Sequence, residues 1–305
     1  MNDHALEVLE FERVLERVAR RAASEVGRAR VLALRPSTDP AGVAREIARV
    51  AAAMRFVAAA PSWAPEPLPD VRADLQLLSV EGSVLEPAGV HRIGRLLEAS
   101  RLLARELAGH DEGYPELDTV AARLVEMREL EKEIGRCVDD EGNVLSSASA
   151  ELKRIRDRLR GAHTKIVRLL EGYLGSLPER FVVADGSVTL RDGRYVVPIR
   201  REGKGEVGGI VHDESQTGAT LYVEPPVAIE AMNRLRDLER DEAREVRRVL
   251  GALTGRIGPH RDALTGAFDA LADFDSLHAR ARAAVGGQVG RAAAAAEPPP
   301  RRELR

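Results

Sequence analysis

The sequence predicts a mainly α protein with a small β insertion, which places it in the α+β class. Three observations support this prediction. Apolar residues recur at three- and four-residue steps through most of the 305 residues, as on one face of a helix. Aromatic residues make up 3% of the chain, too few for a large sandwich or barrel. Residues 181–225 instead combine strand-like alternation with turn dipeptides, so we expect long helices that carry one β-rich module.

Residues 1–147 are predicted to form a helical core domain. A first apolar stripe runs from Phe11 to Ala22. A second helix begins at Asp39-Pro40, where the aspartate can cap the helix and the proline suits its first position. The apolar stripe of this second helix is expected to lie in the core, and it consists of Val43, Ile47, Val50, Met54 and Val57.

Two further helices of the core domain are predicted to begin at prolines. One opens at Glu86-Pro87, and the other opens at Pro115 and continues to Ile134. The proline-rich segment 61–69 connects the earlier helices to these two. Its Trp63 is expected to dock on the helical bundle rather than to serve a ligand.

Two helical arms are predicted on either side of the β module. The first is an ascending helix over residues 148–180, and the second comprises descending helices over 226–286. Residues 236–248 hold ten charged residues among thirteen, and their i,i+3 pairs each contribute ~0.2–0.5 kcal/mol, so this arm can be stable in solvent. The alternative is a surface helix of a compact bundle. The Ala/Pro-rich segment 287–305 is expected to be a flexible tail.

The β module, defined as residues 181–225, is predicted to hold four or five short strands. Asp185-Gly186 and Asp192-Gly193 are predicted to be hairpin turns. Because proline has no amide hydrogen, Pro198 restricts its strand to an edge or a bulge.

Composition limits the possible functions. The single cysteine, Cys137, provides neither a disulfide nor a zinc site, and no apolar run approaches the ~20 residues that cross a bilayer. A cytoplasmic location without a membrane partner is therefore expected.

The chain contains no phosphate-binding loop of the GxxxxGK[ST] type. We favour turn and strand-edge hydrogen bonds for His212 and Asp213 over a metal site or an acid–base pair, and we predict no catalytic residue.

Positive charge is concentrated in the middle of the chain. The formal net charge is −3, from 46 basic and 49 acidic residues. Residues 153–204 nevertheless contain thirteen basic residues and six acidic ones, a local excess of +7. A polyanion site is therefore expected in this window, the alternative being a solvated basic helix face with arginine-rich turns.

Four sequence segments carry a family resemblance. They are GRYVVPIR (193–200), GIVHDESQTGATLYVEP (209–225), NRLRDLERDEAREVRRVL (233–250) and the opening ALEVLEFERVLERVARRAASEVGRARVLALRP (5–36). In this order they resemble bacterial proteins of the MutS family, second type, along nearly the whole chain. The resemblance implies a core domain, lever helices and a clamp formed by the β module. It further implies that the chain is an N-terminal fragment, preceding a dimerising ATPase and usually an Smr nuclease domain.

The resemblance also implies a function. Proteins of this type are expected to embrace nucleic-acid assemblies, either branched DNA in suppression of homologous recombination or collided ribosomes in ribosome rescue. The full-length protein would bind ATP and Mg²⁺ and form a homodimer through its ATPase domain, whereas we expect no cofactor and no catalysis in this fragment. The alternative is a structural dimerisation and lever fragment whose β module binds protein.

The predicted nucleic-acid contacts are basic side chains that can neutralise phosphates without reading bases. The main set is expected at the tip of the module and comprises Arg191, Arg194, Arg200, Arg201 and Lys204. A weaker second set is expected on the ascending helix and comprises Lys153, Arg154, Arg156 and Arg160.

Overall fold

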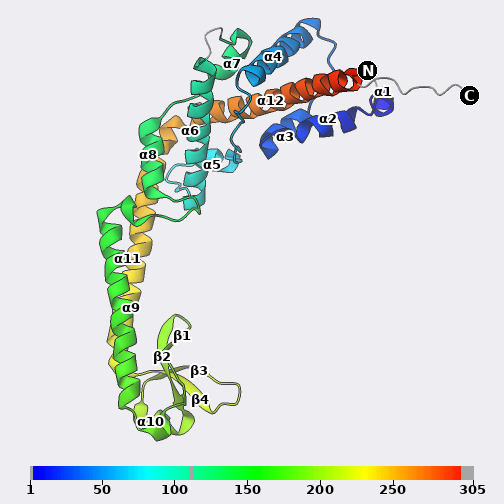
Figure 1. Ribbon diagram of the computed structural model, residues 1–305. Coiled ribbons are helices and arrows are strands. Elements are labelled where there is room, and N and C mark those ends of the chain that lie inside the picture. Colours follow the sequence, from blue (N-terminus) through cyan, green and yellow to red (C-terminus); the bar gives the residue numbers. More distant parts are fainter. Residues whose placement is uncertain (1–2, 110–112, 297–305) are drawn as a thin grey trace, which may run out of the picture. The chain divides into compact units, whose positions relative to one another are not determined.

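The computed structural model describes residues 3–109 and 113–296 (Figure 1). The chain divides into two compact units. Unit 1 is Met1–Asn143 together with Leu250–Arg305, and unit 2 is Val144–Val249. Both are rich in helix, and unit 2 holds a four-stranded antiparallel sheet, so the predicted fold class is confirmed.

Unit 1 is built from helices. These are α1 (Asp3–Val8), α2 (Phe11–Ala19), α3 (Glu25–Leu32), α4 (Pro40–Ala59), α5 (Arg72–Leu77), α6 (Pro87–Ala108), α7 (Asp118–Ala121), α8 (Arg128–Cys137) and α12 (Arg261–Ala296). Asp39 caps α4 through a hydrogen bond from the Ala41 amide to its Oδ1 (3.1 Å), and Pro40 occupies the first turn, as predicted.

Helix α12 lies at the centre of unit 1, where α2, α3, α4 and α6 contact it. Its small side chains allow this close approach from several directions, since Ala267, Ala270, Ala272 and Ala279 are fully buried. This differs from the predicted descending arm over 226–286. Helix α11 (Pro226–Ile257) is followed by a 3-10 turn containing Pro259, and the residues from Arg261 onward form α12, which belongs to the core of unit 1.

The predicted tail also differs in part from the structure. Residues 287–296 belong to α12, whereas residues 297–305 lie outside the described part of the chain.

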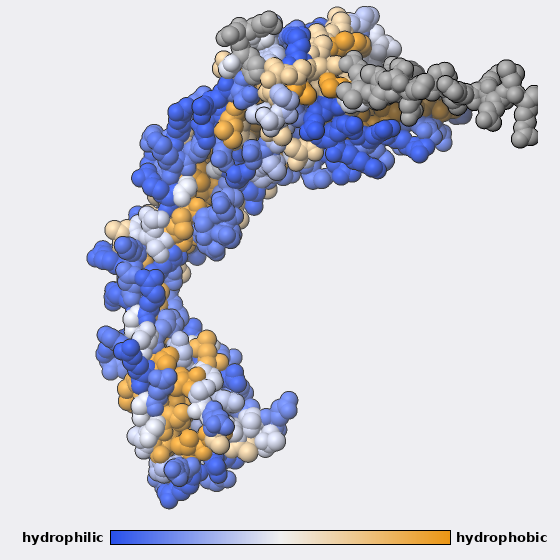
Figure 2. Space-filling view, viewed as in Figure 1, coloured by the Kyte–Doolittle hydropathy of each residue, from blue (hydrophilic) through white to orange (hydrophobic). Residues whose placement is uncertain are grey.

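Helix α4 leaves the first part of its predicted core stripe exposed and the rest, Val50, Met54 and Val57, half-buried. Ala52, Ala53 and Phe56 are buried, whereas Val43 and Ile47 are 38% and 65% exposed. Figure 2 shows hydrophobic surface over α4 near the top of the view. The expectation that Val43 and Ile47 are core residues was therefore wrong. The alanines let α4 approach α12 closely, and periodicity could not choose between two apolar faces of the same helix.

Two other predictions for unit 1 had different outcomes. Trp63 docks on the bundle as expected, with its ring edge-to-face against Phe56 at 5.1 Å between centroids. The helix predicted from Pro115 to Ile134 is instead interrupted. Buried Ser100 stabilises the non-helical segment around Val125, because its hydroxyl donates to the Val125 carbonyl (2.9 Å) and accepts from the Val125 amide (2.7 Å).

Unit 2 consists of two long helices and the β module. Its main elements are α9 (Ala150–Ser176), β1 (Thr189–Arg191), β2 (Arg194–Arg200), α10 (Lys204–Val207), β3 (Ile210–Glu214), β4 (Thr220–Glu224) and α11, which continues into unit 1. A single apolar core joins the helices to the sheet. Its members include Ile155, Leu159, Ile166, Val197, Ile199, Val223, Met232 and Leu235.

The sheet has the strand order β1-β2-β4-β3. Asp192 and Gly193 form the β1–β2 hairpin with φ values of 46° and 70°, as a type I′ turn requires. Asp185-Gly186 makes a turn but joins no strands of the sheet. Strand β2 lies inside the sheet and not at its edge, and the irregular register of the sheet is in β3, so the expectation for the strand of Pro198 was wrong. The β1–β2 ladder ends at Val196, however, so Pro198 itself pairs only with Tyr222 of β4 and needs no amide hydrogen on the β1 side.

The start of α9 is fixed by a polar contact to α11. The Ser149 hydroxyl accepts from the Leu152 amide (2.9 Å) and donates to Glu245 Oε1 (2.6 Å). Hydrogen bonds from the Arg248 guanidinium, and next from Ser149, lower the pKa of Glu245 to about 2. Glu245 therefore remains charged at neutral pH and holds the two helices together at this point.

Candidate nucleic-acid interface

The five predicted tip residues are mostly engaged within the module. Arg191 forms an ion pair with Asp213 (3.0 Å) and lies over the Tyr222 ring at 4.5 Å. Arg194 donates to Glu224 (3.1 Å) and to Asn233 (3.2 Å). These contacts fix both guanidinium groups on the sheet, so they hold the module together as well as carrying charge.

The remaining three tip residues follow the end of β2. Arg200 is exposed and its Nε donates to the Val182 carbonyl (3.1 Å). Arg201 pairs with Glu214 and donates to the Gly218 carbonyl, which ties it to the β3–β4 turn. Lys204 is exposed and forms no ion pair within the described chain.

The second predicted set on α9 is also largely paired. Arg154 pairs with Glu151, and Arg160 pairs with Asp157, in each case one turn apart on the exposed surface. Arg156 reaches across to Glu242 on α11 (2.7 Å). Among these four side chains, Lys153 alone has no ionic partner within residues that the structure describes.

The positive charge of unit 2 lies on α9 and not on the module. Residues 181–225 contain five basic and seven acidic residues, whereas α9 contains seven basic and three acidic ones. The sequence window that gave +7 stopped at Lys204. It therefore left out four acidic residues of the same module, namely Glu206 in α10 and Asp213, Glu214 and Glu224 in the sheet.

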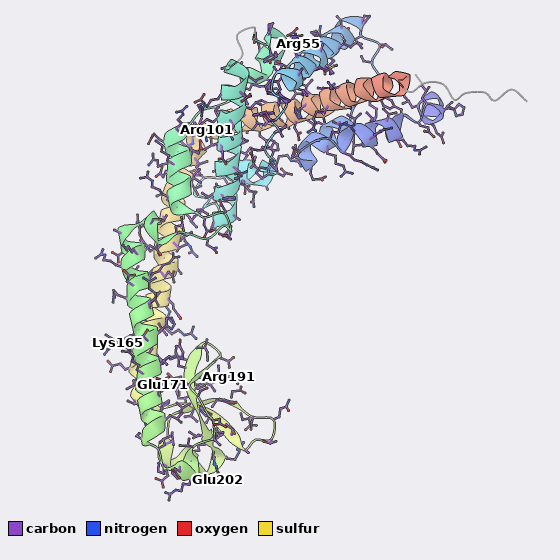
Figure 3. The ribbon with its side chains drawn as sticks, viewed as in Figure 1. Arg55, Arg101, Lys165, Glu171, Arg191 and Glu202 are labelled. Atoms are coloured by element: carbon purple, nitrogen blue, oxygen red, sulfur yellow. The ribbon has the colours of Figure 1, made fainter. Side chains whose placement is uncertain are left out.

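Sequence reasoning missed three exposed cations of α9, which are Arg158, Lys165 and Arg168. None of them forms an ion pair in the described chain. In Figure 3 Lys165 projects from α9 away from the strands. A sequence signal existed, because Arg158 and Lys165 have no acidic residue three or four positions away on the helix.

One buried polar cluster stabilises the module. Glu224 is 1% exposed and accepts from Arg194 (3.1 Å) and forms a second hydrogen bond with His212 Nε2 (2.8 Å). His212 thus has a structural partner, in accord with the hydrogen-bonding role favoured for it. No cluster of three potential metal ligands occurs among the described residues.

Glu224→Gln is expected to lower the free energy of unfolding of the chain by about 2 kcal/mol. The neutral amide keeps the shape but leaves Arg194 and His212 with a weaker, uncharged acceptor. Urea unfolding followed by circular dichroism measures the change. Glu214→Gln is the matched control, because the Glu214–Arg201 pair is exposed and contributes little. Equal losses in the two variants would contradict this role for Glu224.

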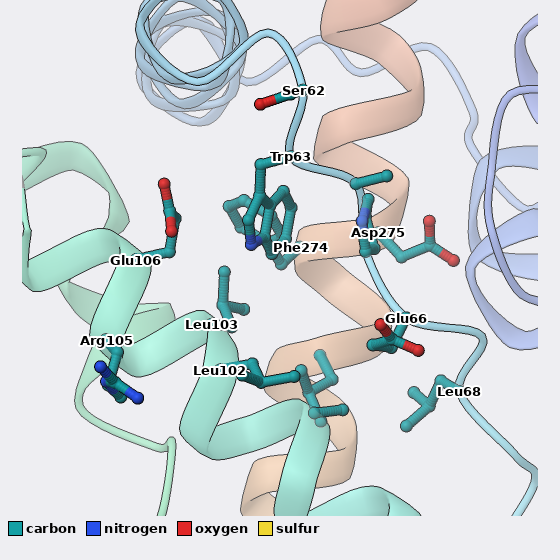
Figure 4. A pocket seen from close by; sticks show the side chains of 14 residues that line it. Ser62, Trp63, Glu66, Leu68, Leu102, Leu103, Arg105, Glu106, Phe274 and Asp275 are labelled. Carbon is teal, nitrogen blue, oxygen red and sulfur yellow. The ribbon is translucent and has the colours of Figure 1, made fainter.

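Unit 1 contains a pocket with an aromatic wall, about 530 Å³ in volume (Figure 4). Trp63, Phe274 and Leu103 line it, and Arg105 and Glu106 lie at its edge. The Asp275 carboxylate points away from Trp63 in Figure 4 and accepts hydrogen bonds from Ala23 and Ser24. This carboxylate is thus already engaged in the core, and we assign no chemistry to the pocket.

No described helix is both long and apolar enough to cross a membrane. The fold and its charges thus define a class: a mainly helical chain whose two long helices carry a four-stranded module, with the positive surface on one of the helices. No family model matches the sequence.

Individual relatives do match. Proteins named Endonuclease MutS2 are similar to the chain, from Gemmatimonas aurantiaca with 46% identity over 293 residues, from Geobacillus thermodenitrificans with 35% over 288 and from Pelotomaculum thermopropionicum with 33% over 282. The matches cover 94%, 92% and 92% of this chain and 36% of each relative. The chain belongs to the MutS2 type and spans about 36% of the length of these relatives.

Proposed function

We propose that this chain is the core, lever and clamp portion of a MutS2-type protein and that unit 2 holds the sugar–phosphate backbone of a nucleic-acid assembly. The assembly would be branched DNA, in suppression of homologous recombination, or the RNA of collided ribosomes, in ribosome rescue. The observation that carries the proposal is the excess of basic residues on α9, seven against three acidic ones, in a chain with MutS2 relatives. Backbone contacts carry no sequence information, which suits a protein that must hold varied assemblies.

The described residues would contribute binding and movement rather than chemistry. The endonuclease activity in the relatives' name, the binding of ATP and Mg²⁺ and the formation of a homodimer are proposals for the whole protein. In that arrangement two copies of unit 2 would act together, and the second contact would gain from a high effective concentration. A single chain should therefore bind weakly.

Binding should depend steeply on salt. We expect the chain to bind a four-way DNA junction and a structured RNA hairpin with Kd values of about 1–100 μM at physiological salt, as is usual for non-specific contacts. The logarithm of affinity should fall linearly with the logarithm of salt concentration. Fluorescence anisotropy at a series of salt concentrations measures both. Absence of binding even at low salt would overturn the proposed function.

The contribution of the module is testable with Arg200→Gln/Lys204→Gln. Arg201 is left unchanged because Glu214 and the Gly218 carbonyl hold it in the fold. If both cations contact duplex phosphates, the salt slope should become shallower by roughly 1.8, since each lost contact removes roughly 0.9. An unchanged slope in a correctly folded variant would exclude this end of the module from the interface.

A second candidate function is protein binding by the β module. It is favoured by the acidic balance of residues 181–225 and by two exposed apolar side chains, Leu190 (55%) and Ile210 (50%). Apolar contacts do not release counterions. Binding of the chain to ribosomes that is unaffected by salt and by both Arg200 and Lys204 substitutions would favour this function.

A further inference from the structure

A straight stripe of positions follows the outer surface of α9. Residues 154, 158, 161, 165, 168 and 172 alternate four- and three-residue steps, and this spacing keeps them on one side of a helix. The stripe consists of Arg154, Arg158, Gly161, Lys165, Arg168 and Gly172. Such spacing usually carries leucines that pack against another helix. Here it carries four cations and two glycines. We therefore expect this surface to contact a linear array of negative charges and not an apolar helix.

Three cations of the stripe are free to bind a partner. Arg158, Lys165 and Arg168 are exposed and have no ion pair within the part of the chain that the structure describes. Of the three acidic residues of α9, Glu151 pairs with Arg154 and Asp157 with Arg160, whereas Glu171 lies one turn from Arg168 and forms no ion pair in the described chain.

Helix α11 of the same unit shows the opposite arrangement. Its residues 226–249 contain six basic and six acidic residues. Several of its arginines form ion pairs with an acidic residue one turn away on the same helix. These pairs are Arg234–Glu230, Arg240–Asp237 and Arg244–Asp241. Two long helices in one unit thus differ in how their charge is compensated, and solubility alone does not require this difference.

The two glycines of the stripe have no packing explanation. A Cβ atom added at Gly161 or at Gly172 would meet no atom within 4 Å. Glycine in a helix interior is destabilising relative to alanine, and at Gly161 and Gly172 it leaves the backbone of α9 uncovered between the cations of the stripe. An uncovered helix backbone between long cations lets a rod-shaped partner approach closely.

We propose that this α9 stripe is a phosphate-backbone contact in which Arg158, Lys165 and Arg168 each neutralise a phosphate of one nucleic-acid strand. The proposal rests on the proposed function and names the surface that performs it. Arg158 and Arg168 are ten residues apart, or about 15 Å along the helix. One strand of a duplex presents a phosphate every ~3.4 Å along the axis, so this length is enough for three separate phosphates. The strand would run along α9, next to Gly161 and Gly172.

The test compares two triple variants of the full chain with equal loss of charge. Arg158→Gln/Lys165→Gln/Arg168→Gln removes the free cations of the stripe. Arg234→Gln/Arg240→Gln/Arg244→Gln removes three paired cations of α11. With a four-way DNA junction as probe, the α9 variant should bind at least about tenfold more weakly at ~0.1 M salt, and its salt slope should be shallower by roughly 2.7. The α11 variant should change much less.

Each result decides between the alternatives. Equal weakening of both variants would mean that net charge alone drives binding and would overturn the stripe. Unchanged binding of the α9 variant, with a wild-type chain that binds, would also overturn it while leaving the proposed function standing. A wild-type chain that binds neither DNA nor RNA would overturn both.

A second variant tests the stripe without removing a cation. Gly161→Leu/Gly172→Leu places bulky uncharged side chains in the path of the strand without changing any charge, and no contact is lost because both sites are open. We expect weaker binding with full helix content by circular dichroism. Equal affinity of this variant and the wild type would show that no strand lies beside the two glycines.

Discussion

Asp275→Ala is expected to lower the free energy of unfolding of the chain by about 4 kcal/mol. Asp275 is 2% exposed and lies on α12, and its carboxylate binds the chain before α3. It accepts hydrogen bonds from the Ala23 amide (2.8 Å), the Ser24 amide (2.9 Å) and the Ser24 hydroxyl (2.6 Å). Alanine would leave the buried Ser24 amide and hydroxyl without an acceptor and would also remove the acceptor of the part-buried Ala23 amide, and each lost bond to a charged group costs about 1.5–3 kcal/mol.

The same carboxylate supports the start of α3. The Ser24 hydroxyl that donates to Asp275 also accepts from the Gly27 amide (3.0 Å), which caps the helix, and a carboxylate at this end is favoured by the helix dipole. Gly27 fits because a Cβ there would lie 2.1 Å from Asp275 Oδ2. Chemical unfolding of Asp275→Ala and Ser24→Ala separates these effects. Ser24→Ala should cost only about 1 kcal/mol, and equal losses would contradict the dominant role of the carboxylate.

The sequence could predict local features of this fold but not the long-range ones. The Asp39-Pro40 start of α4 and the Asp192-Gly193 hairpin depend on neighbouring residues and were predicted correctly. The Asp275–Ser24 contact joins residues 251 positions apart, and the sequence around neither residue indicates it. In α4, periodicity allowed two apolar faces, and the buried face is the one with Ala52, Ala53 and Phe56, whose ring contacts Trp63 and Phe274.

The same limitation applies to the candidate interface. A linear window counts charges that are near in sequence, whereas a sheet gathers charges that are near in space. Arg191 and Asp213 are 22 positions apart and form an ion pair, so the acidic residues beyond Lys204 reduce the charge of the module. On α9 the sequence is a better guide, because an unpaired cation in a helix can be recognised from the absence of acids three and four residues away.

Stability between pH 6.5 and pH 4 is expected to depend on His278. This side chain is 2% exposed and its Nδ1 has no hydrogen-bond partner. Its ring stacks on Phe274 at 6.3 Å and meets Trp63 edge-to-face at 5.9 Å. Burial, and to a smaller extent the charge of Arg282, lowers the pKa of His278 from 6.5 to about 4.

The direction of the pH effect follows from this lowered pKa. Between pH 6.5 and pH 4 the unfolded chain binds a proton at His278 that the folded chain does not, so stability falls as the pH falls through this window. The full shift corresponds to about 3 kcal/mol, and below pH 4 both states are protonated and the effect is complete.

His278→Phe keeps an aromatic ring among Phe274 and Trp63 but cannot bind a proton. The difference in unfolding free energy between wild type and His278→Phe, measured in urea from pH 7 to pH 4, should therefore shift by about 3 kcal/mol in favour of the variant. Parallel pH profiles of the two proteins would show that His278 is protonated as easily in the folded chain as in the unfolded one.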